Sequence, residues 1–147
     1  MDTKKPTNSQ QLQNLKERTI TLRNSILNNH AEPIVSKDNA TNNYWYEVLY
    51  DLVVSLNNVL NDIYTLVHIS EYPANRTTIT DDELEEMLIL LGSILRLSVH
   101  QIRSCLNEQP NPNHTWKAII DLEAHVSVKT HELQYKRESA IVEESRV

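Results

Sequence analysis

The sequence predicts an all-α protein: an elongated antiparallel helical bundle or coiled coil of three long helices plus a shorter N-terminal helix. Leucine, isoleucine and valine recur at helical spacing through most of the 147 residues, between short proline- and asparagine-rich breaks. The chain has one glycine, Gly92, whereas tight turns and phosphate-binding loops usually need several. Only 39% of the residues are hydrophobic and 5% aromatic, so we expect a modest core and helical faces that contact partners.

The N-terminal part of the chain is predicted to hold one helix between two flexible segments. Residues 1–8 are polar and are expected to be disordered. Residues 9–28 carry a narrow apolar seam with alternating steps of three and four, which predicts the N-terminal helix. The seam consists of Leu12, Leu15, Thr19, Leu22 and Ile26. Residues 29–43 contain Pro33 and little periodicity, and are predicted to be a flexible linker. Whether this helix packs on the remaining bundle is left open.

The antiparallel bundle itself is predicted to span residues 44–144, with a tail at 145–147. Its first helix runs from Tyr44 to Ser70, where a heptad rhythm is widened by further apolar positions. A stripe this wide is typical of a helix that contacts more than one neighbour. At about 1.5 Å per residue this helix would be roughly 40 Å long. Pro73 lies in the break that follows.

The next helix carries its own start signal. Thr80 and Glu83 form a capping-box pattern, and acidic residues in the first turn suit the helix dipole. An apolar face continues to about Asn107 and includes Cys105. Gly92 falls in the middle of this helix, where glycine costs roughly 1 kcal/mol relative to alanine. The cost indicates either close helix packing at Gly92 or tolerance of a small defect.

The last helix is predicted to begin near His114 or Thr115, after a break that contains Pro110 and Pro112, and to extend to Glu144. Its inner face begins at Trp116, and its apolar signal thins beyond Leu133. The end of this helix is therefore expected to be frayed or docked on another molecule. The long helices are joined by short connections that allow antiparallel packing.

Composition argues against several classes of function. A formal charge of −6 without any basic run argues against direct nucleic-acid binding. The longest nearly unbroken apolar run, Met87–Leu91, is too short to span a membrane. The first ten residues lack the apolar core of a signal peptide. One cysteine, Cys105, suits a reducing compartment, so the nucleus or the cytosol is expected.

No pattern in the chain predicts an active site, a metal or another cofactor. His125 and His131 are six residues apart and lie on different helix faces, and no His-Glu-x-x-His pattern occurs. The acidic residues 81–86 are explained by helix capping and solvation. Cys105 lies on a predicted apolar face without an activating neighbour, so we expect a buried structural thiol. We therefore expect a non-enzymatic protein.

Four features between residues 44 and 137 occur together. They are two central amphipathic helices (Tyr44–Ser70 and Leu84–Leu106), a proline-bearing break, the triplet His114, Thr115 and Trp116, and the stretch Glu132, Leu133, Lys136 and Arg137. In these features the chain resembles the cyclin-dependent-kinase-2-interacting protein family of small helical nuclear proteins. The resemblance implies an adapter that links replication kinases and the DNA-damage checkpoint. It also implies a role beside AAA-type ATPases that remodel chromatin-bound and pre-ribosomal complexes.

The leading interpretation is an adapter subunit of a nuclear assembly that binds other proteins through helical seams. One alternative is a small coiled-coil subunit of kinetochore, Mediator or microtubule-nucleating machinery, and another is a ligand- or metal-binding four-helix bundle. The first candidate contact surface is Trp116 with His114 and Thr115, although Trp116 has the alternative of packing against Trp45 or Tyr72 inside the bundle. The second consists of Tyr135, Lys136 and Arg137, for which the alternative is a solvated helix end.

Overall fold

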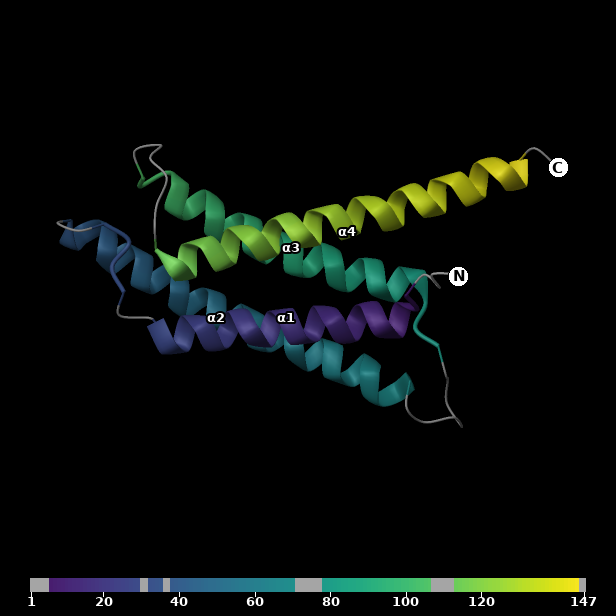
Figure 1. The fold of residues 1–147 in the computed structure, drawn as a ribbon, viewed down its shortest axis with the longest axis horizontal. Coiled ribbons are helices and arrows are strands. Elements are labelled where there is room, and N and C mark those ends of the chain that lie inside the picture. Colours follow the sequence, from purple (N-terminus) through teal and green to yellow (C-terminus); the bar gives the residue numbers. More distant parts are fainter. Residues whose placement is uncertain (1–5, 30–31, 36–37, 71–77, 107–112, 146–147) are drawn as a thin grey trace, which may run out of the picture.

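The computed structural model describes residues 6–29, 32–35, 38–70, 78–106 and 113–145, which form four helices and, over these ranges, no strand (Figure 1). The helices are α1 (Asn8–Asn29), α2 (Asn39–Ser70), α3 (Asp81–Arg103) and α4 (His114–Ser145). The predicted all-α class is confirmed. The helix lengths differ from the predicted three long helices and one shorter helix. Two helices are long, α2 and α4 with 32 residues each, and two are shorter, α1 with 22 and α3 with 23.

The four helices pack in a ring in chain order, and α4 returns to contact α1. Along the ring the direction alternates (Figure 1). The two shorter helices, α1 and α3, also approach each other across the ring, whereas the described backbones of α2 and α4 do not. The chain therefore forms an antiparallel four-helix bundle. A regular coiled-coil geometry stays a prediction.

Helix α1 is part of the bundle, which answers the question that the sequence left open. The predicted seam is buried throughout, from Leu12 to Ile26. Within it, the hydroxyl of Thr19 donates a hydrogen bond of 2.7 Å to the carbonyl oxygen of Leu15, so this polar side chain is satisfied in an apolar interface. The helix is one residue longer at each end than predicted, and it begins at Asn8, inside the segment expected to be disordered. Residues 1–5 lie outside the described residues.

The prediction of a flexible linker at 29–43 is wrong for its described residues. Helix α2 begins at Asn39, and Asp38 caps it by accepting hydrogen bonds from the backbone N–H and the hydroxyl of Thr41. Ile34 is only 4% exposed and belongs to the core. The buried side chain of Asn42 accepts hydrogen bonds from the backbone N–H groups of Ile34 and Val35. These contacts hold the connection against the start of α2 because a buried N–H needs a partner.

Helix α3 begins as its sequence predicts. The hydroxyl of Thr80 accepts a hydrogen bond from the Glu83 N–H, and the Glu83 carboxylate accepts one from the Thr80 N–H, which together make a capping box. The helix ends at Arg103, earlier than predicted, and a turn leads on to Leu106. Gly92 supports the close-packing alternative, because a Cβ added there would lie 3.3 Å from Cγ1 of the buried Val126 on α4.

Candidate functional site

The first candidate surface turns out to be part of the core. Trp116 is 7% exposed and meets the fully buried Trp45 edge to face, with ring centroids 6.3 Å apart and an interplanar angle of 74°. This geometry is favoured between aromatic rings. Trp116 therefore adopts the packing alternative, and its ring offers little surface to a partner.

A set of hydrogen bonds ties the start of α4 to the connection before α2. The side chain of Asn113 accepts a hydrogen bond of 2.9 Å from the Trp116 N–H, as a helix N-cap does, and donates to the carbonyl oxygens of Glu32 and Pro33. The indole N–H of Trp45 donates to the same Glu32 oxygen at 3.2 Å. These bonds join segments up to 81 residues apart in the chain.

The other two residues of the triplet differ in exposure. The Thr115 side chain is fully buried, and within the described residues its hydroxyl has no hydrogen-bond partner. His114 is exposed, and its backbone N–H donates to the Glu32 carboxylate at 3.3 Å. The triplet therefore anchors α4 in the bundle, and only the His114 side chain faces solvent.

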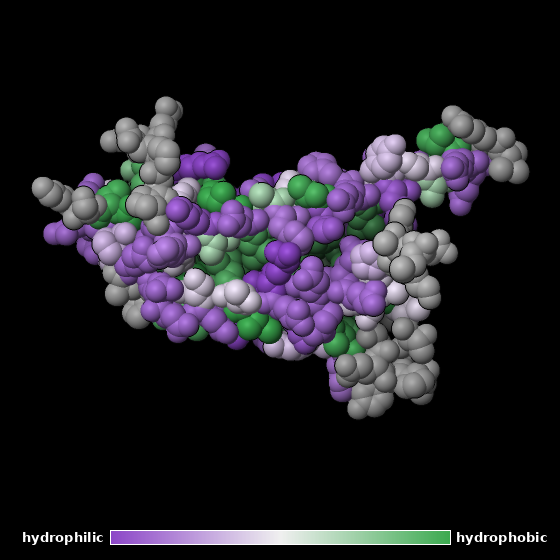
Figure 2. All heavy atoms as spheres, in the orientation of Figure 1, coloured by the Kyte–Doolittle hydropathy of each residue, from purple (hydrophilic) through white to green (hydrophobic). Residues whose placement is uncertain are grey.

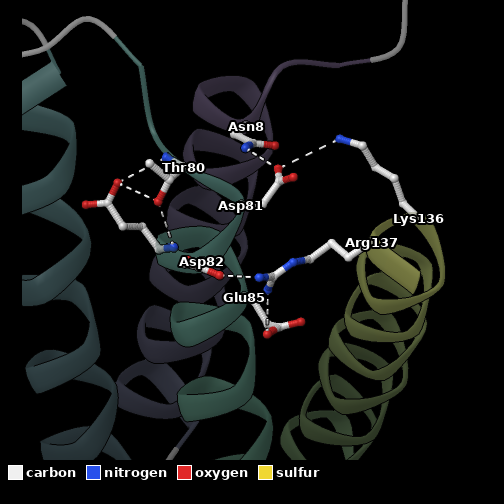
Figure 3. A network of polar contacts seen from close by, with 8 residues as sticks. Asn8, Thr80, Asp81, Asp82, Glu85, Lys136 and Arg137 are labelled. Carbon is white, nitrogen blue, oxygen red and sulfur yellow. Dashed lines mark hydrogen bonds and ion pairs between the residues drawn. The ribbon is translucent and has the colours of Figure 1, made fainter. Parts of the chain in front are cut away.

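The second candidate surface lies at the opposite end of α4, in residues 134–145, which we call the distal arm. At its base, both Lys136 and Arg137 reach the first turns of α3 (Figure 3). Lys136 Nζ lies 3.8 Å from the Asp81 carboxylate. Arg137 pairs with Asp82 and, at 2.8 Å, with Glu85. The second candidate surface is thus partly used within the molecule, since two of its three residues pair with the acidic start of α3.

These ion pairs change the proton affinity of Arg137. Partial removal from water opposes its positive charge, but the carboxylates of Asp82 and Glu85 outweigh that effect and raise its pKa. The Asp81 carboxylate, which pairs with Lys136 of α4, also accepts a hydrogen bond of 2.7 Å from the side chain of Asn8 at the start of α1. Three helices therefore meet through polar side chains where the distal arm leaves the bundle.

Beyond Arg137 the distal arm projects past the described bundle (Figure 1). The reason is helix register: α4 runs antiparallel to α3, and Arg137 already faces the first turns of α3, so no described part of α3 continues beside the later turns. The last buried residue of α4 is Leu133. Large apolar side chains beyond it are exposed, with Tyr135 at 73% and Ile141 at 65%. Figure 2 shows apolar surface on this projecting end.

A groove between α1 and α4 has a volume of about 430 Å³. Figure 2 shows apolar surface in the hollow between these helices and hydrophilic surface beside it. Its floor includes Leu22 and Leu122, which are both almost completely buried, and its walls carry Glu17, Arg18 and Asp121. The groove thus has an apolar floor, and its charged walls carry both signs.

The groups that sequence reasoning considered for metal binding and catalysis stay apart. Among the described residues, no three histidine, cysteine, aspartate or glutamate side chains are grouped as a metal site would require. Cys105 is half-buried in the turn after α3, where its thiol contacts the Gln101 carbonyl oxygen at 3.6 Å. The expectation of a buried thiol on the apolar face of the helix is therefore wrong. Burial, aided by Arg18 and Lys129, lowers the pKa of His125.

Comparisons of the chain with protein-family models, with curated proteins and with solved structures found no match. None of the described helices combines the length and apolarity of a membrane span.

Two features of the candidate sites could not be predicted from the sequence, namely the anchoring role of Asn113 and the exposure of Ile141. The thinning of the apolar pattern beyond Leu133 was the available signal for the second of these.

Proposed function

We propose that this chain is a non-enzymatic helical adapter subunit of a nuclear multi-protein complex, and that the distal arm is a surface through which it binds another protein. The observation that carries the proposal is the projection of the arm beyond Arg137, with Ile141 exposed on the projecting part and Tyr135 exposed at its base. A helix that leaves its bundle with apolar side chains in water gains most from packing against a further helix or groove.

The remainder of the bundle supports an architectural role. The core extends through all four helices, and both tryptophan side chains pack inside it. Apolar side chains are also exposed on the other helices, for example Tyr50 and Leu97, and exposed apolar side chains are common in monomeric proteins. Beyond Arg137, the exposed apolar side chains of the distal arm lie on a segment that projects past the described bundle.

The nuclear assignment and the class of complex rest on the resemblance to the cyclin-dependent-kinase-2-interacting protein family. On that basis the partners would be replication kinases, checkpoint proteins or AAA-type ATPases of ribosome maturation. In this chain Thr115 and Trp116 of the shared triplet serve internal packing. The resemblance therefore supports the architecture more directly than it supports any particular partner.

The test is affinity purification of the full chain from its own cells, followed by mass spectrometry. The parent chain is compared with the double variant Tyr135→Ser/Ile141→Ser and with the matched control Tyr50→Ser/Val54→Ser, which removes exposed apolar side chains from α2. We expect the parent and the control to recover the same proteins and the arm variant to lose at least one of them. Equal recovery by all three chains, or a parent recovered alone, would overturn the proposal.

The identity of the recovered proteins decides the finer assignment. AAA-type ATPases or replication kinases would support the family resemblance. Kinetochore, Mediator or microtubule-nucleating proteins would keep the adapter and discard that resemblance.

A further inference from the structure

We infer that the distal arm and the first turns of α3 bind a basic amphipathic helical segment of a partner protein. This inference rests on the proposed function, because it names the chemistry of the partner that the arm binds. It follows from three properties of this end of the molecule: its charge, its exposed apolar side chains and its helix terminus.

The net charge of the chain is concentrated at this end. Residues 81–86 and 134–145 carry eight carboxylates and two cations, a formal charge of −6, which equals the charge of the whole chain. All other residues, Arg146 included, carry twelve carboxylates and twelve cations. Ion pairs between Lys136, Arg137 and the start of α3 bring the two segments together in space. If Arg146, which directly follows the arm, is counted with this end, the end carries −5 and the rest of the chain −1, so most of the net charge lies at this end.

Much of this acidic charge faces solvent. Asp82 keeps 79% of its side chain exposed although it pairs with Arg137. On the arm, Glu138, Glu143 and Glu144 are all exposed, and no cation follows Arg137 among the described residues. Both described cations of the arm lie at its base and already face carboxylates. A partner with positive charge is therefore complementary to this surface.

The helix terminus adds to the unbalanced charge. The C-terminal end of a helix carries partial negative charge on its unpaired carbonyl groups, so glutamates near it are unfavourable and cations are favourable. The last turn of α4 contains no basic residue, while Glu143 and Glu144 lie close to its end. Lysine or arginine side chains of a partner would be favoured beside this helix end.

The exposed apolar side chains of the arm require a partner that carries apolar side chains as well as basic ones. Ile141 lies between Glu138 and Glu144, three residues from each, so an exposed apolar side chain and exposed carboxylates share adjacent positions on the helix surface. A basic segment without apolar side chains would leave Ile141 in water. Tyr135 lies six residues earlier, on a different side of the helix, and a segment that reached it would cover a second exposed apolar side chain. An amphipathic helix whose leucine face is bordered by lysines would match both kinds of side chain.

Other occupants fit this surface less well. Anionic membranes and nucleic acids would be repelled by it. A second copy of the chain would place the exposed carboxylates of one arm against those of the other, with the cations of both arms already paired to α3. These occupants are outcomes that the experiment can reveal.

The experiment measures binding of labelled 18-residue peptides to the full chain by fluorescence anisotropy. The probe is an amphipathic leucine/lysine helix, and the comparison peptides are a leucine/glutamate helix and a serine/lysine peptide of equal charge. We expect the leucine/lysine peptide to bind at least tenfold more tightly than either comparison peptide. Its Kd should increase when salt is raised from 50 to 300 mM, because salt screens exposed charges.

Three variants locate the binding surface. The first is Glu138→Gln/Glu143→Gln/Glu144→Gln, and the second is Tyr135→Ser/Ile141→Ser. The charge-matched control is Glu47→Gln/Asp51→Asn/Asp62→Asn, which neutralises three exposed carboxylates on α2. Circular dichroism checks that each variant keeps its helix content. We expect each arm variant to weaken binding of the leucine/lysine peptide at least tenfold and the control to change it less than twofold.

The inference is overturned if the control weakens binding as much as the arm variants, or if either comparison peptide binds as tightly as the probe. Binding of anionic vesicles, or arm-dependent dimers in sedimentation, without peptide binding would also overturn it. Failure of the inference differs from failure of the proposed function. If the peptide does not bind but the arm variant loses proteins in the purification, the adapter proposal stands and the basic partner is wrong.

Discussion

Substitution of Trp116 by alanine tests whether this residue belongs to the core or serves as a partner anchor. The variant Trp116→Ala removes a ring that is 93% buried and that packs edge to face on Trp45. The N-cap bond from the Trp116 backbone to Asn113 can persist, because it does not involve the lost side chain. The change is therefore confined mainly to packing.

The expected loss of stability follows from burial. Truncation of a buried tryptophan or phenylalanine to alanine costs about 3–5 kcal/mol, which includes the cavity that remains. The edge-to-face contact accounts for about 0.5–1.5 kcal/mol of such a loss. Trp116 lies in the first turn of α4, at the end of the bundle, where water can enter the space, so we expect about 3–4 kcal/mol. For a chain of this size that corresponds to a decrease in Tm of roughly 10 °C.

The assay is urea unfolding followed by circular dichroism at 222 nm, because tryptophan fluorescence changes with the substitution itself. Tyr135→Ala is the control, since this aromatic side chain is 73% exposed and should change the unfolding free energy by less than about 0.5 kcal/mol. Trp116→Phe should lose about half as much as Trp116→Ala because it keeps an aromatic ring. If Trp116→Ala loses less than about 1 kcal/mol and abolishes partner binding instead, the packing argument is refuted.

Substitutions of Gly92, Asn113 and His125 test other contacts. In the same urea assay, Gly92→Ala should change the unfolding free energy by less than about 1 kcal/mol, because the gain in helix propensity opposes the tight contact with Val126. Gly92→Leu should cost about 1–3 kcal/mol, because the larger side chain overpacks this contact. Asn113→Ala should cost about 1–3 kcal/mol, since it removes the α4 N-cap and two long-range hydrogen bonds, and Asn28→Ala on the exposed end of α1 should be near neutral. Burial lowers the pKa of His125 below 6.5, so the stability that its neutral form contributes is present above pH 6.5 and is lost as the pH falls through the folded-state pKa. The variant His125→Gln should therefore show a smaller difference in urea midpoint between pH 7.5 and pH 5 than the parent. An equal difference in the two proteins would contradict this reasoning.

Local patterns predicted much of the fold. The alternating three- and four-residue steps in α1 place all five seam residues on one side of a helix, and all five are buried. The capping box of Thr80 and Glu83 was predictable because its two partners are three residues apart. In both cases the geometry of a single helix decides the contact.

Contacts between distant segments could not be predicted in the same way. Ile34 is buried because Asn42 and the start of α4 hold its segment in place, and nothing in the local pattern of residues 29–43 indicates that. The pairing of Arg137 with Asp82 and Glu85 depends on the register of α4 against α3. The point where the distal arm leaves the bundle is likewise set by the starts of α1 and α3, which the sequence of α4 does not contain.

The two long helices, α2 and α4, touch through Trp45 and Trp116 at one end of the bundle, while their described backbones stay apart along their length. If the other ends of α2 and α4 were pulled apart, the two helices would therefore rotate about the tryptophan contact. A force that separates the free ends of α2 and α4 would meet its main resistance in the shorter helices α1 and α3, which lie between them. Because the distal arm extends beyond those helices, it lengthens the lever on one side, so a partner that pulls on it would act with greatest leverage far from the tryptophan contact.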